Sequence, residues 1–301
     1  MDKKALQGII ASLGIDSFEI APFKSVEDGA EYNVWKVGSE FVLKKAKGCE
    51  IQIYSTFFSD KTSGTPRFFK SVKFAEDDYF LMEFVEGEDL CICKRDKLTK
   101  ALDALIYIQE KHWNPKEHEN CGLSFSESLE RRKNRGKYLF DRELEEAYSS
   151  FISAYEHTPR TLCHDDLLPF NILVSEDRAT LIDWEVAGIL PYPTPLARLL
   201  AHTEEKDGAM FYMTEEDRLF AIDYYYENLP AKHGISYNEY RKTLDLFLLY
   251  EYCEWITLGN KYDDADMDLF EKYKAKSNKH LKLMEAHYGI QKDLRHHPRG
   301  V

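Results

Sequence analysis

The chain has 301 residues, of which 44% are hydrophobic, so it can bury one large core or two smaller ones. Its formal net charge is −13, which argues against a nucleic acid as the main partner, because nucleic-acid-binding proteins carry a basic surface. The acidity fits a soluble surface or, as a second reading, a cationic ligand.

The N-terminal residues and the cysteines bear on the compartment. The start, MDKKAL, lacks the apolar stretch of a signal peptide, and no window approaches the roughly 20 apolar residues that cross a bilayer. The six cysteines contain no C-x-x-C pair, which indicates reduced, structural thiols, and a metal site at Cys91-x-Cys93 is disfavoured. We therefore expect a cytoplasmic protein that binds neither membrane nor nucleic acid.

Short β-branched or aromatic runs fill the first ninety residues and predict strands. The runs are Phe18–Phe23, Tyr32–Val37, Glu40–Lys45, Phe68–Phe74 and Tyr79–Phe84. Polar segments such as Glu27-Asp28-Gly29 supply the turns between them. Residues 50–58 instead have helical spacing, so this region predicts an antiparallel sheet carrying one helix.

From Asp96 onward the hydrophobic period becomes that of helices. Capping boxes that open helical stretches are Ser124-x-x-Glu127, Thr214-x-x-Asp217 and Ser236-x-x-Glu239. Only 171–174 and 179–183 interrupt with strand-like runs. The pattern predicts an α+β, two-lobe fold: a β-rich N-lobe over residues 1–87, with a hinge near 82–87, and a helical C-lobe over 88–301. A cleft between two lobes is a usual place for a ligand.

The segment 161–186 carries the most informative polar residues. His164, Asp166 and Asn171 fit the H-x-D-x-x-x-x-N pattern of a kinase catalytic loop. A strand, a turn and a second strand then bring Asp183 close to Asn171, although they are twelve positions apart. Phosphoryl transfer needs this set: two oxygen ligands for Mg²⁺ beside a carboxylate aimed at the attacking hydroxyl. Such residues also occur singly as turn and cap residues, but the whole set rarely arises by chance.

A lysine on a central strand of the small lobe is the second requirement of kinase chemistry, where it holds the α- and β-phosphates. Strand alternation places Val42 and Lys44 on one face, and Glu50 is the candidate helical partner of Lys44. Lys45 is the competing register. The apolar strand 79–87 then ends in an acidic turn, where backbone groups could bind an adenine edge and Met82 could line the pocket.

These motifs together resemble the aminoglycoside phosphotransferase and choline kinase family, which is related to protein kinases. His164-Asp165-Asp166 resembles its H-G-D or H-N-D, Ile182-Asp183-Trp184-Glu185 its I-D-W-E, and residues 81–87 its hinge. The resemblance covers about residues 30–200. It implies a kinase that uses Mg²⁺ and ATP or GTP.

The resemblance also assigns roles to individual residues. It implies Asp166 as catalytic base, Asn171 and Asp183 as magnesium ligands, and Lys44 with Glu50 as the phosphate-holding pair. It further implies backbone nucleotide contacts near Glu83 and Val85, with Met82 in the same pocket.

Two positions depart from the family pattern. Asp165 sets a second carboxylate beside Asp166, although the spacing to Asn171 still selects Asp166 as the base. Pro195 stands where the family often has an aspartate, so packing or loop rigidity can differ there. The nucleotide flap is also glycine-poor, with only Gly29 between Phe23 and Val37.

The acceptor site is expected to face Asp166 from the helical lobe. Residues 223–227 and 250–255 could form an acidic, aromatic wall for a cationic acceptor, although packing is the simpler reading of their tyrosines. We expect an aminoglycoside, amino alcohol or sugar as acceptor. The alternative is a silent pseudokinase that binds nucleotide or a protein partner.

Two further readings are disfavoured. A protein kinase lacks support, because no Asp-Phe-Gly or Ala-Pro-Glu follows Asp183. His112 and His118 lack the carboxylate and cysteine neighbours of a metal site. The motifs are shared by kinases with different acceptors, so they leave open the acceptor, the choice between ATP and GTP, and the oligomeric state.

Overall fold

A computed structural model describes residues 3–15, 19–24, 29, 31–59, 64–117, 120–262 and 265–288. The start of the first predicted strand at Phe18, the predicted turn at Glu27-Asp28 and His118 lie outside these ranges. The chain forms two compact units, described separately below. The first unit comprises Met1–Ser128 and Thr158–Gly234, and the second comprises Leu129–His157 and Ile235–Val301. The predicted division into lobes near residue 87 stays a prediction.

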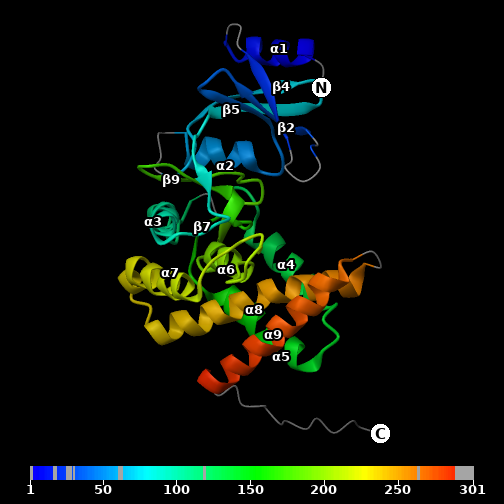
Figure 1. Ribbon diagram of the computed structural model, residues 1–301, viewed down its shortest axis with the longest axis vertical. Coiled ribbons are helices and arrows are strands. Elements are labelled where there is room, and N and C mark those ends of the chain that lie inside the picture. The colour runs from blue at the N-terminus through cyan, green and yellow to red at the C-terminus, as the bar shows by residue number, and fades with distance from the viewer. Residues whose placement is uncertain are drawn as a thin grey trace. The chain divides into compact units, whose positions relative to one another are not determined.

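A five-stranded antiparallel sheet opens the first unit, in the order β1-β2-β3-β5-β4 (Figure 1). The strands are β1 (Ile20–Lys24), β2 (Glu31–Val37), β3 (Phe41–Lys45), β4 (Phe68–Phe74) and β5 (Asp77–Glu83). The predicted helix is α2 (Glu50–Phe57). The mixed class predicted from the sequence, with antiparallel strands first and helices after them, is confirmed.

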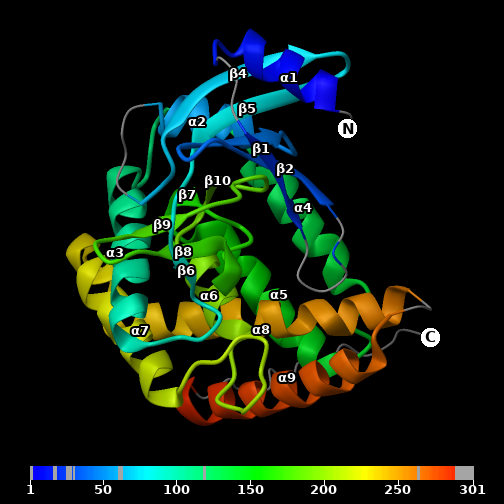
Figure 2. The ribbon, with the colours of Figure 1, turned by 45° about the horizontal axis from the view of Figure 1, so that its top comes forward.

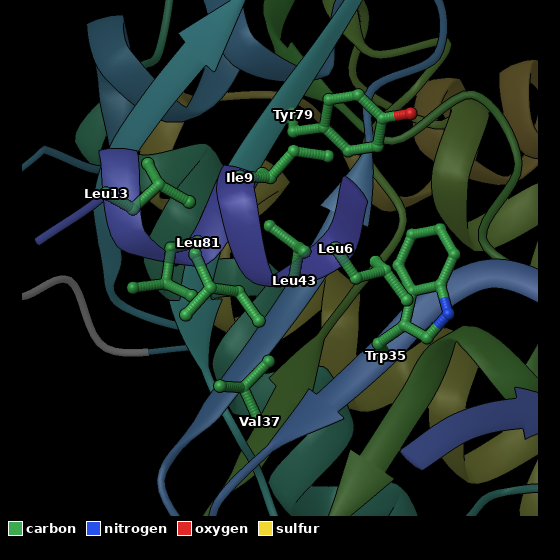
Figure 3. Close-up of a cluster of buried hydrophobic side chains, with 9 residues drawn as sticks. Leu6, Ile9, Leu13, Trp35, Val37, Leu43, Tyr79 and Leu81 are labelled. Atoms are coloured by element: carbon green, nitrogen blue, oxygen red, sulfur yellow. The ribbon is translucent and has the colours of Figure 1, made fainter. Parts of the chain in front are cut away.

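The two faces of this sheet carry different helices. A further helix, α1 (Lys3–Ser12), packs its apolar side on one face, where Leu6, Ile9 and Leu13 join a buried cluster with Leu43 (Figure 3). The opposite face meets α2, whose Tyr54 ring lies 5.5 Å from that of Phe80. Because strand side chains alternate, Leu43 points toward α1 while its neighbour Lys44 points to the α2 side.

The rest of the first unit frames the polar segment identified in the sequence. A three-stranded sheet, β6-β8-β9, and a two-stranded sheet, β10-β7, lie beside α3 (Arg95–Lys111) (Figure 2). The strands are β6 (Glu88–Asp89), β7 (Arg160–Cys163), β8 (Ile172–Val174), β9 (Ala179–Leu181) and β10 (Gly188–Pro191). The remaining helices are η1 (Pro169–Asn171), α6 (Thr194–Ala201), α7 (Glu215–Asn228) and η2 (Pro230–His233).

Of the predicted capping boxes in this unit, the one at Ser124 is confirmed in full and the one at Thr214 forms its N-cap bond alone. The Ser124 hydroxyl accepts the Glu127 N–H at 3.3 Å, and the Glu127 carboxylate returns to the Ser124 N–H, at the start of α4 (Phe125–Gly136). Thr214 accepts the Asp217 N–H at 3.0 Å at the start of α7. Each cap satisfies an amide that the first helical turn leaves without a partner.

The second unit contains the end of α4 and three long helices, α5 (Arg142–His157), α8 (Tyr237–Lys261) and α9 (Met267–Tyr288). Ser236 caps α8, as predicted, by accepting the Glu239 N–H at 3.2 Å. The core between α5 and α8 is aromatic, with the Phe151 and Tyr250 rings stacked 4.6 Å apart. None of the helices in the described residues is long and apolar enough to cross a membrane.

Candidate active site

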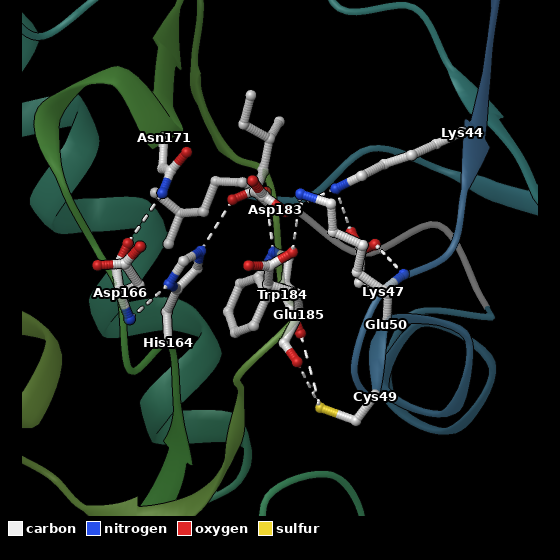
Figure 4. A network of polar contacts seen from close by, with 12 residues as sticks. Lys44, Lys47, Cys49, Glu50, His164, Asp166, Asn171, Asp183, Trp184 and Glu185 are labelled. Atoms are coloured by element: carbon white, nitrogen blue, oxygen red, sulfur yellow. Dashed lines mark hydrogen bonds and ion pairs between the residues drawn. The ribbon is translucent and has the colours of Figure 1, made fainter. Parts of the chain in front are cut away.

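A buried lysine joins the five-stranded sheet to the segment after β9 that carries Asp183. The Lys44 ammonium lies 2.6 Å from Glu50 Oε1 and 2.6 Å from Asp183 Oδ1 (Figure 4). Lys44 is 6% exposed and Glu50 is 1% exposed, so the pair is removed from water. Lys45, the competing register, instead pairs with Asp77 at the surface.

The three groups carry a net charge of −1, because two carboxylates share one ammonium. Burial disfavours the charged form of Lys44, but Glu50 and Asp183 outweigh it and raise the pKa of the lysine. Burial raises the pKa of Glu50 to about 7, against the opposing attraction of Lys44. Lys44 therefore stays protonated throughout the neutral range.

The catalytic-loop residues are tied to one another through the backbone. The Asp166 N–H donates to His164 Nδ1 at 3.3 Å, and Asn171 Nδ2 donates to the Asp166 carbonyl at 2.9 Å (Figure 4). His164 is buried, which lowers its pKa, and its Nε2–H donates to the Ile182 carbonyl at 2.8 Å. The neutral imidazole thus links the loop to the residue before Asp183.

Asn171 and Asp183 offer oxygen atoms of the kind that Mg²⁺ prefers. The Asn171 amide donates through Nδ2 toward Asp166, which leaves Oδ1 as its acceptor atom. Asp183 has a positive φ of 66°, an uncommon conformation for a residue with a side chain and one that clusters at functional sites. The Ile182 N–H donates to the Asn171 carbonyl at 2.9 Å, so the two segments run together.

Glu185 adds a carboxylate that the sequence reasoning did not place in the site. Ligand atoms of Glu50, Asp183 and Glu185 lie within 4.8 Å of one another. Lys44 contacts both Glu50 and Asp183, whereas Glu185 Oε2 lies 3.7 Å from Lys47 Nζ. The signal was available in the sequence, because Glu185 follows Asp183 by two residues in the quoted motif.

The turn between β3 and α2 packs tightly on the hairpin that carries Asp183. The Cys49 N–H donates to the Glu185 carbonyl at 3.1 Å, and the Cys49 thiol lies 3.2–3.8 Å from the carbonyl oxygens of Trp184, Glu185 and Ala187. A Cβ on Gly48, whose φ is +49°, would lie 2.2 Å from the Glu185 oxygen, so only glycine fits there. Burial raises the pKa of the Cys49 thiol.

The predicted hinge follows β5. Met82 is buried on the same face of the sheet as Val42, its cross-strand partner. The Glu83 N–H donates to the Arg67 carbonyl at 2.9 Å, and the Glu83 side chain pairs with Arg178. Among the described residues, none accepts a hydrogen bond from the Val85 N–H.

Arg198 of α6 is a second residue that the sequence reasoning missed. Its Nε and Nη2 atoms each lie 2.9 Å from Asp166 Oδ1. No motif spacing marks this contact, because 32 positions separate the two residues. Pro195, which stands where the family often has an aspartate, lies buried in the first turn of the same helix.

Two tyrosines of the predicted acceptor wall, Tyr225 and Tyr250, are packing residues. Tyr225 is fully buried, and its hydroxyl donates to Gln109 Oε1 at 2.6 Å within the first unit. Tyr250 is buried in the aromatic core of the second unit. Tyr225 and Tyr250 therefore give no support to a cationic acceptor.

Three features are typical of a kinase-like phosphotransferase: the buried Lys44 of the sheet, the loop with Asp166 and Asn171, and the segment with Asp183. A family model described as "Phosphotransferase enzyme family" matches residues 22–229, and the chain belongs to that family. Its family therefore makes the chain a phosphotransferase.

Solved structures share the fold at low sequence identity. The choline kinase LicA from Streptococcus pneumoniae is 14% identical with a TM-score of 0.60, covering 93% of this chain and 99% of its own. An aminoglycoside phosphotransferase from Alicyclobacillus acidocaldarius is 13% identical with a TM-score of 0.59, covering 93% and 94%. A choline kinase from Cryptosporidium parvum is 14% identical with a TM-score of 0.56, covering 95% and 96%. No curated protein matches the chain in sequence.

Proposed function

We propose that the protein transfers the γ-phosphate of a magnesium-bound nucleotide, ATP or GTP, to a hydroxyl of a small aminoglycoside, amino alcohol or sugar. The observation that carries the proposal is the buried lysine that contacts both Glu50 and Asp183, because it joins the phosphate-holding pair to the metal-binding hairpin. A purely structural sheet has no need of a lysine buried between two carboxylates, because buried ion pairs contribute little to stability.

The nucleotide would enter beside the hinge and β3. The Val85 N–H is available for an adenine nitrogen, and the buried Met82 side chain lies on the face of the sheet that carries Lys44. A fold relative, a thermostable mutant of an aminoglycoside phosphotransferase, was solved in a complex with AMP-PNP and hygromycin B. That complex supports a nucleotide donor and a small-molecule acceptor here.

Each residue of the site has a distinct task in the transfer. Lys44 would hold the α- and β-phosphates, and Asn171 and Asp183, with Glu185 beside them, would hold Mg²⁺, which would neutralise phosphate charge when bound. Asp166 accepts the proton of the acceptor hydroxyl while the hydroxyl oxygen bonds to the γ-phosphorus. The bond from that phosphorus to the nucleoside diphosphate breaks, and the proton later passes from Asp166 to water. Positioning supplies most of the rate in such a reaction.

The experiment is nucleotide turnover with Mg²⁺-ATP, and separately Mg²⁺-GTP, against aminoglycosides, amino alcohols and sugars. Asp166→Asn is the blank, and Asp165→Asn is the matched control, because both remove one carboxylate from the same turn. We expect one acceptor class to stimulate turnover, Asp166→Asn to lower it about 10²–10⁴-fold, and nucleotide affinity to stay unchanged.

Other outcomes would redirect the proposal. If Asp166→Asn keeps near-normal turnover while Asp165→Asn loses it, the base is Asp165. Silence across the panel, with tight Mg²⁺-nucleotide binding by the same sample, would favour the pseudokinase alternative. Stimulation by neutral sugars and by no amine would remove the cationic acceptor.

A further inference from the structure

The proposed base has an arginine partner from a different element of the first unit. Arg198 Nε and Nη2 both point at Asp166 Oδ1, each at 2.9 Å. The arginine side chain is 17% exposed, against 38% for the aspartate, so the contact is partly shielded from water. The Nε–H donates to Oδ1 and Nη2 forms an ion pair with the same oxygen, and a charge-assisted hydrogen bond of this kind is shorter and stronger than one between neutral groups.

The guanidinium is itself held on its third side. Arg198 Nη1 lies 3.0 Å from Nε2 of His202, which is one helical turn further along the chain. Because a guanidinium has no acceptor atom, the histidine nitrogen accepts this hydrogen bond. Arg198 thus has donors engaged on both sides before any substrate arrives.

The backbone of Asp166 is fixed as well as one of its oxygens. Its N–H donates to His164 and its carbonyl accepts from Asn171. With Oδ1 turned to Arg198, the carboxylate has one oxygen left, and no residue among the described part of this unit hydrogen-bonds that Oδ2. The free oxygen is the one that can receive a hydroxyl proton.

We infer that Arg198 is a positioning residue of the transfer, which holds Asp166 so that Oδ2 faces the acceptor hydroxyl. The inference rests on the proposed function of Asp166. In the reaction the acceptor proton moves to Oδ2, the acceptor oxygen bonds to the γ-phosphorus, and the nucleoside diphosphate leaves. Arg198 keeps its charge and its contact with Oδ1 throughout.

The same contact allows an opposite role. A guanidinium bound to the base could restrain it until a substrate displaces the arginine, and Arg198 would then inhibit the enzyme. The two roles differ in sign: removing a positioning residue lowers kcat, whereas removing a restraint raises it.

The test compares Arg198→Ala and Arg198→Lys with Arg95→Ala in steady-state turnover of the acceptor found above. Arg95 is the matched control, because it is also an arginine that pairs with an aspartate, Asp217, in the same unit. Turnover of each variant is repeated with millimolar guanidinium chloride, which can occupy the space that the alanine leaves. Thermal unfolding and Mg²⁺-nucleotide binding are measured on the same samples.

We expect Arg198→Ala to lower kcat about 10²-fold with the nucleotide KM unchanged, Arg198→Lys to retain an intermediate kcat, and Arg95→Ala to match the unsubstituted protein. Guanidinium should restore part of the kcat of Arg198→Ala and of no other variant. An unchanged or raised kcat of Arg198→Ala would overturn the inference. A lower kcat that guanidinium does not restore, together with lower thermal stability, would overturn it as well. If the unsubstituted protein shows no Asp166-dependent turnover, the proposed function itself fails. If Arg198→Ala has the same turnover as the unsubstituted protein, only the inference about Arg198 fails.

Discussion

Replacing Glu50 by glutamine removes one of the two carboxylates that share Lys44. The cluster of Lys44, Glu50 and Asp183 then changes from a net charge of −1 to a neutral pair of Lys44 and Asp183, which already lie 2.6 Å apart. Loss of one partner from a buried ion pair usually destabilises a protein, because it leaves a charge without compensation. Here the substitution has the opposite effect on charge balance.

The size of the effect follows from the pKa of Glu50. Burial raises that pKa to about 7, from an ordinary value of 4.5. Because the folded state holds the proton more tightly, the contribution of Glu50 to stability is complete below pH 4.5 and is lost as the pH rises through 7. The loss amounts to about 3 kcal/mol by pH 8.

Glutamine gives up one hydrogen bond in exchange. Glu50 accepts from Lys44 Nζ through one oxygen and from the Lys47 N–H, at 3.2 Å, through the other. An amide has one acceptor atom, so one of these donors loses its partner, at about 1 kcal/mol. Glu50→Gln should therefore be about 1 kcal/mol less stable at pH 4.5 and about 2 kcal/mol more stable at pH 8.

Urea unfolding of both proteins across this pH range measures the difference. Lys44→Met is the companion variant, since it leaves two carboxylates without their cation and should cost about 3–5 kcal/mol at pH 8. Turnover of Glu50→Gln should nevertheless fall about 10²-fold, because Lys44 is less firmly aimed at the phosphates. A Glu50→Gln protein that is clearly less stable at pH 8, or a difference that does not change with pH, would refute the reasoning.

Two other substitutions test the metal hairpin and the core. Asp183→Asn should abolish magnesium-dependent nucleotide binding in calorimetry, because it removes a charged oxygen ligand, while Asp177→Asn in the exposed hairpin turn should bind normally; equal binding by both would defeat the metal assignment. Leu43→Ala, in the fully buried cluster under α1, should lower the free energy of unfolding by about 3–5 kcal/mol, and Leu219→Ala, which is half exposed, by far less. Similar losses for the two leucines would contradict the packing that the structure assigns to the cluster.

Much of the sheet and the loop could be predicted because the signals are local. The strand over 68–74 and the helix that begins at Glu50 agree with the structure, since their periods are set by neighbouring residues. The capping box at Ser124 was equally readable, because both partners lie within one helical turn. Lys44 and Glu50 follow the same logic, being six positions apart on consecutive elements.

Other features depend on contacts that no local pattern records. The strand Gly188–Pro191 was not predicted, because its formation depends on pairing with β7 and on a backbone approach in which a Cβ on Gly188 would lie 2.1 Å from the Leu123 oxygen. Helix α1 is buried through contacts with strands further along the chain, so its burial depends on the sheet. The pairing of Arg198 with Asp166 required the fold that brings α6 to the loop.

The close packing of Gly48 and Cys49 against the backbone of residues 184–187 has a mechanical consequence. The turn after β3 cannot slide along the Asp183 hairpin without breaking the amide bond to Glu185 and separating the thiol from three carbonyls together. The strand that carries Lys44 and the hairpin that carries Asp183 are therefore expected to travel as one body whenever the first unit opens or closes. Any bending that admits a nucleotide must occur elsewhere, and the spacing of lysine and aspartate would survive each catalytic cycle.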